Sequence, residues 1–168
     1  MINKFLFPKA AWFLLIGLGL WRLGYSQDKS KLIQLVKRKF QLMSRHELDA
    51  AASMYSDSAR IASLGYREIQ IGPAGFKSVY SRYFTGSPDL SYTISRIIPS
   101  KHTVTVEYTS TGTIRHVEQQ ASDYMIGKTY SLKNCSILDF RNGKIVSEMT
   151  YFDQVSFLTQ VGFFGQHR

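Results

Sequence analysis

Residues 141–153 read RNGKIVSEMTYFD and carry the clearest structural signal in the chain. Asn142 and Gly143 stand between two apolar runs, and both residues tolerate the positive φ that a type I′ turn requires. The stretch therefore predicts a β-hairpin whose second strand alternates between two faces. One face carries five residues: Ile145, Ser147, Met149, Tyr151 and Asp153. The other face carries four residues: Val146, Glu148, Thr150 and Phe152.

Asp153 is the leading candidate for a catalytic residue, because it ends the strand face that carries Met149 and Tyr151. Among apolar neighbours its pKa would be raised, and it would serve as a general acid or base beside a carbonyl group. A second role is open, since a short apolar helix is expected at residues 155–161. An aspartate directly before a helix accepts amide hydrogens as an N-cap, which would keep it ionised. A buried carboxylate favours an enzyme, and a capping one favours a non-catalytic module.

The rest of the chain predicts helices first and strands afterwards. The expected helices cover residues 31–43, about 44–55 and 73–84, and the expected strands cover 59–64, 90–98, 103–116 and 128–140. Strands in a block after helices are typical of the α+β class. We expect a curved antiparallel sheet that forms a cone-shaped barrel, covered by three helices, with a small-molecule pocket at its mouth.

The composition suits one folded domain at residues 28–168. The chain has 168 residues, of which 44% are hydrophobic, and this is enough for a single core. Cys135 is the single cysteine, and the four histidines have no spacing typical of metal ligands. Neither a metal nor a cofactor is predicted.

The charge is concentrated near the start of this domain. Asp28 is the one acidic residue of the segment 28–45. The same segment contains six basic residues: Lys29, Lys31, Lys37, Arg38, Lys39 and Arg45. This basic helix is either an ordinary solvated face or a surface that contacts an anionic membrane. No aromatic platform or zinc spacing accompanies it, so nucleic acid is not an expected partner.

Residues 1–27 are predicted to be a signal peptide or a membrane anchor. Lys4 and Lys9 supply positive charge, and residues 10–21 form a twelve-residue apolar run. This run is short for a membrane-spanning helix, and Ser26 ends a possible cleavage site. Arg22 is unusual before a cleavage site, so an uncleaved membrane anchor is a second interpretation of this segment. A cytosolic protein is the third. We expect the protein to be exported (periplasmic, lumenal or secreted) or anchored to a membrane.

Five further residues are candidates for substrate binding: Tyr55, Tyr80, Phe84, Glu107 and Tyr151. Tyr55 follows a helix and would donate a hydrogen bond to a substrate oxygen, or would be a core aromatic residue. Tyr80 and Phe84 would form pocket wall or core, and Glu107 would point into the cone or to solvent.

Several segments in order resemble the SnoaL-like branch of the nuclear-transport-factor-2-like superfamily. They cover about residues 30–165 and are 54–60, 72–76, 87–89, 104–107, 111–113, 127–128 and 151–162. The resemblance implies a cone-shaped α+β barrel, commonly dimeric, in a family of polyketide cyclases, isomerases, dehydratases and epoxide hydrolases. Asp153 matches the acid/base aspartate of the cyclases. The histidine that those enzymes carry on the preceding strand is missing, since residues 136–139 read SILD.

These features predict a domain with a pocket for a small hydrophobic ligand. As an enzyme it would be a cofactor-free cyclase, isomerase or lyase that acts on a hydrophobic carbonyl compound through Asp153. The alternative is a non-catalytic ligand-binding or dimerisation module, which residues 1–27 would hold at a membrane if they are an anchor. A homodimer is expected in both cases.

Overall fold

The structure is a computed structural model that describes residues 29–63, 68–118 and 120–165. Within these ranges the first helix covers residues 29–44. Three α-helices follow: α2 (Leu48–Ala52), α3 (Gly72–Gly86) and α4 (Gln154–Gln160). Two short 3₁₀ helices lie at Gln120–Met125 and Phe163–Gly165. None of the helices in the described ranges is both long and apolar enough to cross a membrane, and the predicted targeting segment lies outside them.

In the described part of the chain six strands form one sheet: β1 (Tyr55–Ser63), β2 (Gln70–Ile71), β3 (Ser91–Pro99), β4 (Thr103–Thr113), β5 (Thr129–Arg141) and β6 (Lys144–Phe152). Their order is β2-β1-β6-β5-β4-β3, and β1 runs parallel to β6 while the other neighbours are antiparallel. The predicted α+β class is therefore confirmed. The expected closed antiparallel barrel is wrong, because the sheet is mixed and its outer strands, β2 and β3, do not pair. The two-residue β2 offers too few backbone groups to close the sheet.

The hairpin that the sequence predicts joins β5 to β6 at the middle of the sheet. Asn142 and Gly143 both have positive φ, at 51° and 74°. The register shifts between Asp139 and Phe140, after which β6 alternates regularly. Glu148 faces the core with 1% of its surface exposed, whereas Tyr151 is 46% exposed on the outer face. The inner face of β6 is therefore the one that carries Glu148, and the face that carries Asp153 points outward.

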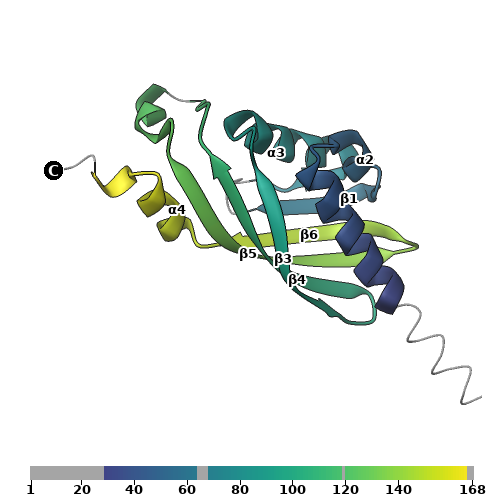
Figure 1. The fold of residues 1–168 in the computed structure, drawn as a ribbon. Helices are drawn as coiled ribbons and strands as arrows, with labels where there is room; N and C mark the ends of the chain where they lie inside the picture. The colour runs from purple at the N-terminus through teal and green to yellow at the C-terminus, as the bar shows by residue number, and fades with distance from the viewer. Residues whose placement is uncertain (1–28, 64–67, 119, 166–168) are drawn as a thin grey trace, which may run out of the picture.

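The first helix, α2 and α3 lie on the same side of the sheet, and α4 lies beyond one end of it (Figure 1). Phe40 of the first helix packs its ring against Tyr108 of β4, with ring centroids 4.6 Å apart. The inward side chains of β4 alternate with outward ones, so that Val104 and Val106 are fully buried. One face of the sheet thus forms the core with the helices, and none of the described helices covers the other face.

Helix α3 begins at a position that only glycine fits well. Gly72 has φ of 64°, and a Cβ atom there would lie 2.5 Å from the carbonyl oxygen of Asp57. Pro73 follows at the first helical turn, where its missing N–H costs nothing. This start directs Phe76, Val79 and Tyr80 of α3 into the core.

Candidate functional site

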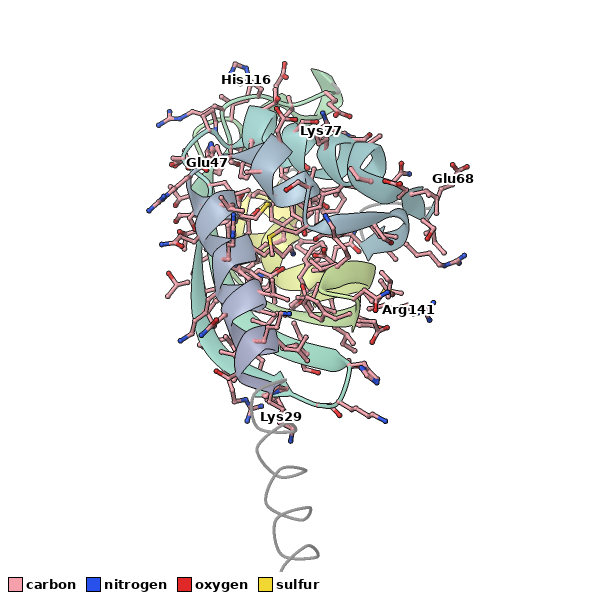
Figure 2. The ribbon with its side chains drawn as sticks, turned by 90° about the vertical axis from the view of Figure 1, so that its right-hand side faces the viewer. Lys29, Glu47, Glu68, Lys77, His116 and Arg141 are labelled. Atoms are coloured by element: carbon pink, nitrogen blue, oxygen red, sulfur yellow. The ribbon has the colours of Figure 1, made fainter. Side chains whose placement is uncertain are left out.

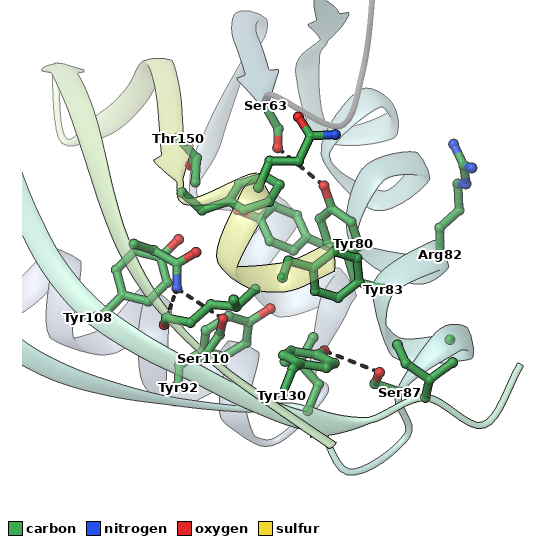
Figure 3. A pocket seen from close by; sticks show the side chains of 18 of the residues that line it. Ser63, Tyr80, Arg82, Tyr83, Ser87, Tyr92, Tyr108, Ser110, Tyr130 and Thr150 are labelled. Atoms are coloured by element: carbon green, nitrogen blue, oxygen red, sulfur yellow. Dashed lines mark hydrogen bonds between the residues drawn. The ribbon is translucent and has the colours of Figure 1, made fainter. Parts of the chain in front are cut away.

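A cavity of about 320 Å³ lies at the end of the sheet where β6 leads into α4 (Figure 3). Five tyrosines line it: Tyr80, Tyr83, Tyr92, Tyr108 and Tyr130. The remaining wall is largely apolar and includes Leu90, Ile114, Leu132, Phe152, Phe157 and Leu158. Tyr130 meets Phe157 of α4 edge to face, with ring centroids 5.5 Å apart, so α4 forms one wall of the cavity.

The described residues that line this cavity include no aspartate, glutamate or histidine. Arg82 is the one lining residue with a permanent charge. Its guanidinium forms an ion pair with Glu118, and Figure 3 shows it pointing away from the tyrosines. The cavity therefore presents aromatic rings, hydroxyls and amides, rather than a charged acid–base pair, to a ligand. Across the described ranges, no three His, Cys, Asp or Glu side chains lie close enough together to hold a metal ion.

A buried carboxylate lies behind the tyrosines. Oε1 of Glu148 accepts hydrogen bonds from Nζ of Lys39 and from the hydroxyl of Tyr80, each at 2.7 Å. The hydroxyl of Tyr55 donates to Oε2 of the same group. Lys39 and Glu148 are 2% and 1% exposed, so water does not screen this ion pair.

These contacts fix the protonation of the cluster. Burial alone would raise the pKa of Glu148, but the charge of Lys39 and the hydrogen bonds from Lys39, Tyr55 and Tyr80 hold it below its ordinary value. Burial and the negative charge of Glu148 raise the pKa of Tyr55 and of Tyr80 well above the usual value. Glu148 is thus a carboxylate at neutral pH, and both tyrosines remain neutral donors to it.

A chain of hydroxyl groups extends the cluster along the cavity floor. The Tyr108 hydroxyl lies 3.2 Å from Oγ of Ser136, which lies 2.7 Å from Oγ1 of Thr150. Thr150 in turn donates to Oε1 of Glu148 at 3.5 Å. Tyr108 and Thr150 both line the cavity. The floor is therefore polar but internally satisfied, which makes it rigid.

Some polar atoms on the wall are left for a ligand, and two of them belong to Tyr92 and Asn134. Within the described part of the chain, the hydroxyl of Tyr92 makes no hydrogen bond, although the residue lines the cavity. Burial raises the pKa of Tyr92 well above its usual value, and the neighbouring tyrosines raise it to a smaller extent. The hydroxyl of Tyr92 therefore keeps its proton. Asn134 donates through Nδ2 to Ser110 and to the backbone of Leu132, which leaves its Oδ1 as an acceptor. A ligand oxygen thus finds a donor in Tyr92, and a ligand hydroxyl finds an acceptor in Asn134.

The structure separates the predicted substrate-binding residues. Tyr80 lines the cavity, and Tyr55 lies behind it on Glu148. Phe84 does not line the cavity, because its ring stacks on His46 with centroids 4.0 Å apart.

Two other predicted residues lie on the open face of the sheet. Glu107 forms a two-bond ion pair with Arg96 of β3, with Nε 3.0 Å from Oε2. Tyr151 is exposed there beside Cys135 of β5. Both side chains point away from the cavity, because successive residues of a strand face opposite sides of the sheet. Glu107 is next to the lining residue Tyr108, and Tyr151 is next to the lining residue Thr150.

Asp153 occupies the capping position that was the second role open to it. Its Oδ1 accepts a hydrogen bond from the backbone N–H of Ser156 at 3.0 Å, at the start of α4. The side chain is exposed and does not line the cavity, although Phe152 and Gln154 on either side of it do. A catalytic role for Asp153 stays a prediction.

Glu148 was given no role from the sequence, and Lys39 was expected among the exposed basic side chains of the first helix. The structure corrects the second point, because Lys39 is buried and paired. A signal was present in the spacing, since Lys39 follows Val36 by three residues and precedes Met43 by four. It therefore falls on the buried stripe of the helix, where a charge needs a partner.

The fold is shared with several solved structures of low sequence identity. A protein from Xanthomonas campestris pv. campestris, provisionally described as a polyketide cyclase, is 23% identical, with 80% of this chain and 98% of that chain covered and a TM-score of 0.66. AclR from Streptomyces galilaeus, provisionally described as a hydroxylase, is 18% identical over 80% and 86% of the chains, with a TM-score of 0.67. A SnoaL-like protein from Jannaschia, provisionally described as a polyketide cyclase, is 13% identical over 80% and 93%, also with a TM-score of 0.67.

No curated protein sequence matches the chain. At these low identities the solved structures show the fold of the chain but not its chemistry. The family model of the SnoaL-like domain matches residues 36–148, which is more than half of the chain and includes both Lys39 and Glu148. The chain therefore belongs to the SnoaL-like domain family.

Proposed function

We propose that the tyrosine-lined cavity binds a small, uncharged and largely apolar molecule that carries at least one oxygen, and that the domain acts as a binding module. The observation that carries this proposal is the composition of the wall, which combines five tyrosines and aliphatic side chains with no carboxylate or imidazole among the described lining residues. Burial of a charged ligand without a partner costs several kcal/mol, roughly, so such a wall favours a neutral one.

The size of the cavity and the neighbouring structures agree with such a ligand. A volume of about 320 Å³ is at the lower end of the range for small-molecule sites and suits two or three rings. Two of the similar structures are provisionally described as polyketide cyclases, and polyketides are carbon skeletons that bear oxygen atoms. The hydroxyl of Tyr92 supplies the donor that a ligand carbonyl needs.

The aromatic ketone flavone and the hydrocarbon 2-phenylnaphthalene form a matched pair of probes, because they have similar shapes and only flavone carries oxygen. We expect both to raise the melting temperature of the full chain, and flavone to bind more tightly by about three- to tenfold, the value of one hydrogen bond. Calorimetric titration measures the difference. If neither flavone nor a panel of other neutral aromatic ketones raises the melting temperature, the proposal is wrong.

A cofactor-free isomerase or cyclase is the second candidate, because Asp153 lies between two cavity-lining residues, Phe152 and Gln154. Its carboxylate would have to leave the N–H of Ser156 and enter the cavity to take a proton from carbon beside a carbonyl. Exchange of the α-protons of 2-tetralone into D₂O, followed by NMR, tests this directly. The enzyme hypothesis requires exchange in the wild type and a loss of about 10²-fold or more in Asp153→Asn.

The homodimer is proposed to form through the open face of the sheet. Ile137 and Met149 are cross-strand neighbours there and are each 37% exposed, and Tyr151 continues the apolar surface. Light scattering of the wild type and of Met149→Asp measures the assembly, and we expect only the variant to be monomeric. An equal mass for both proteins would exclude this face as the interface.

Export or membrane anchoring is likewise proposed, from the apolar run at residues 10–21. Cell fractionation and sequencing of the mature N-terminus test it. Recovery of protein that keeps Met1 in the soluble cytosol would contradict it.

A further inference from the structure

A second cavity, of about 750 Å³, lies at the opposite end of the sheet from the tyrosines. Three segments that are distant in sequence form it: the start of the first helix, the turn between β3 and β4, and the turn between β5 and β6. Each segment contributes basic side chains, which are Lys31, Lys101, His102 and Arg141. Figure 2 looks onto this end of the molecule, with Lys29 and Arg141 labelled.

The positive charge of this cavity is not neutralised by an ion pair within residues 29–63, 68–118 and 120–165. In the described part of the chain, no carboxylate pairs with Lys31, Lys101 or Arg141. Asp139 is the one acidic residue of the lining, and its Oδ1 accepts the hydroxyl hydrogen of Thr103 at 2.6 Å. Three cations against one carboxylate leave an excess that attracts an anion.

The position of the cavity indicates what that anion is. Lys31 lies at the start of the described chain, so the residues that precede it in sequence join the domain at this end. Those residues include the apolar run at 10–21 that is expected to target or anchor the protein. A juxtamembrane cluster of Lys and Arg is the pattern that anionic lipid headgroups attract.

We propose that this basic cavity binds the phosphate group of anionic lipids and holds the basic end of the domain against a membrane surface. A phosphate group offers several acceptor oxygens to converging ammonium and guanidinium groups. In this orientation the tyrosine-lined cavity, at the other end of the sheet, opens away from the membrane. The inference does not depend on which ligand that cavity takes.

The test uses the full chain and two kinds of vesicle, one of phosphatidylcholine alone and one with phosphatidylglycerol added at about one part in four. Flotation measures the partition into each, and their ratio removes any contribution of the apolar run, which is the same for both. Lys31→Ala/Lys101→Ala/Arg141→Ala removes three cations from the cavity. The matched control, Arg60→Ala/Lys128→Ala/Lys133→Ala, removes three exposed cations that line neither cavity. Thermal melting checks that both variants are folded.

We expect the wild type to prefer the anionic vesicles, and the cavity variant to lose on the order of 100-fold of this preference, at about fivefold for each cation. The control variant should lose less than about threefold, because charges far from the contact act only through a screened field. Equal losses in the two variants would show that net charge alone is responsible and would overturn the proposal.

Two soluble probes exclude other sources of phosphate. If inorganic phosphate raises the melting temperature of the wild type but not of the cavity variant, while both prefer anionic vesicles equally, the site takes a soluble phosphate and the lipid proposal is wrong. It is also wrong if a short DNA duplex binds the wild type more tightly than the anionic vesicles do and the cavity variant loses that binding.

Discussion

The two ends of the sheet differ in the charge of the side chains that line their cavities. At the end beside α4, the described wall contains five tyrosines and one charged side chain, Arg82, which is paired with Glu118. At the end beside the β5–β6 hairpin, Lys31, Lys101 and Arg141 surround a cavity without an ion-pair partner in the described chain. One end of the sheet therefore presents a largely neutral, aromatic wall, and the other end presents an excess of positive charge.

The ion pair between Lys39 and Glu148 lies in the core and supports the neutral cavity. Its carboxylate accepts the hydroxyl hydrogens of Tyr55 and Tyr80, so these hydroxyls are fixed before a ligand arrives. A charge that is buried and paired therefore positions neighbouring side chains, whereas the unpaired charges at the other end remain available to an external anion.

The largest effect is expected where the core pair is broken. Lys39→Met leaves Glu148 buried without its cation and should lower the free energy of unfolding by about 3–5 kcal/mol, measured by urea denaturation. Lys37→Met, at an exposed position two residues earlier, is the control and should change it by less than about 0.5 kcal/mol. The double variant Lys39→Met/Glu148→Gln should recover part of the loss, because it removes both charges and keeps an amide oxygen as an acceptor for the tyrosine hydroxyls. A single variant as stable as the control would show that the pair does not hold the core.

The second effect is the acid sensitivity of the same pair. The pKa of folded Glu148 is below its ordinary value, so its contribution to stability is complete above the unfolded pKa of about 4.3 and is lost as the pH falls through the folded pKa. Between about pH 5 and pH 2, the melting temperature of Glu148→Gln should therefore fall less steeply than that of the wild type. Glu107→Gln, at a surface ion pair, is the control and should follow the wild type. Parallel curves for the wild type and Glu148→Gln would contradict this.

A third and smaller effect concerns the free hydroxyl on the wall of the neutral cavity. Tyr92→Phe keeps the ring and removes the donor, so the affinity for flavone should fall by about three- to tenfold while 2-phenylnaphthalene binds as before. Tyr151→Phe makes the same chemical change outside the cavity and should leave both affinities unchanged. Titration calorimetry gives the four constants. Equal binding of flavone by Tyr92→Phe and the wild type would remove Tyr92 from the site.

The smallest effect is expected at Asp153. Asp153→Ala should lower the free energy of unfolding by about 0.5–1 kcal/mol, because the N–H of Ser156 loses its acceptor, while Asp153→Asn should change it little. Neither variant should alter flavone affinity, since the side chain lies outside the cavity. Denaturation and calorimetry measure the two quantities, and tighter or weaker flavone binding by Asp153→Asn would place the carboxylate at the ligand.

Part of the site was predictable and part was not. Tyr80 was expected on the pocket wall, and the spacing of α3 places it there. Tyr151 and Glu107 were expected near a substrate, but both side chains lie on the outer face of the sheet. Which face is the outer one depends on where the helices pack, and this is a tertiary feature. Glu148 was overlooked because a charged residue in a strand is ordinarily exposed, and its partner is 109 residues away.

Local sequence patterns were enough to predict the α+β class, the Asn142–Gly143 hairpin and the start of α3 at Gly72–Pro73. These features depend on local backbone preferences and on short periodicities, which neighbouring residues carry among themselves. Only the tertiary structure decided the parallel pairing of β1 with β6, the open edge of the sheet and the burial of Lys39 against Glu148. These features depend on contacts between distant segments. A charged residue is stable in the core only when folding brings its partner to it, and the residues next to it in sequence do not indicate which partner that will be.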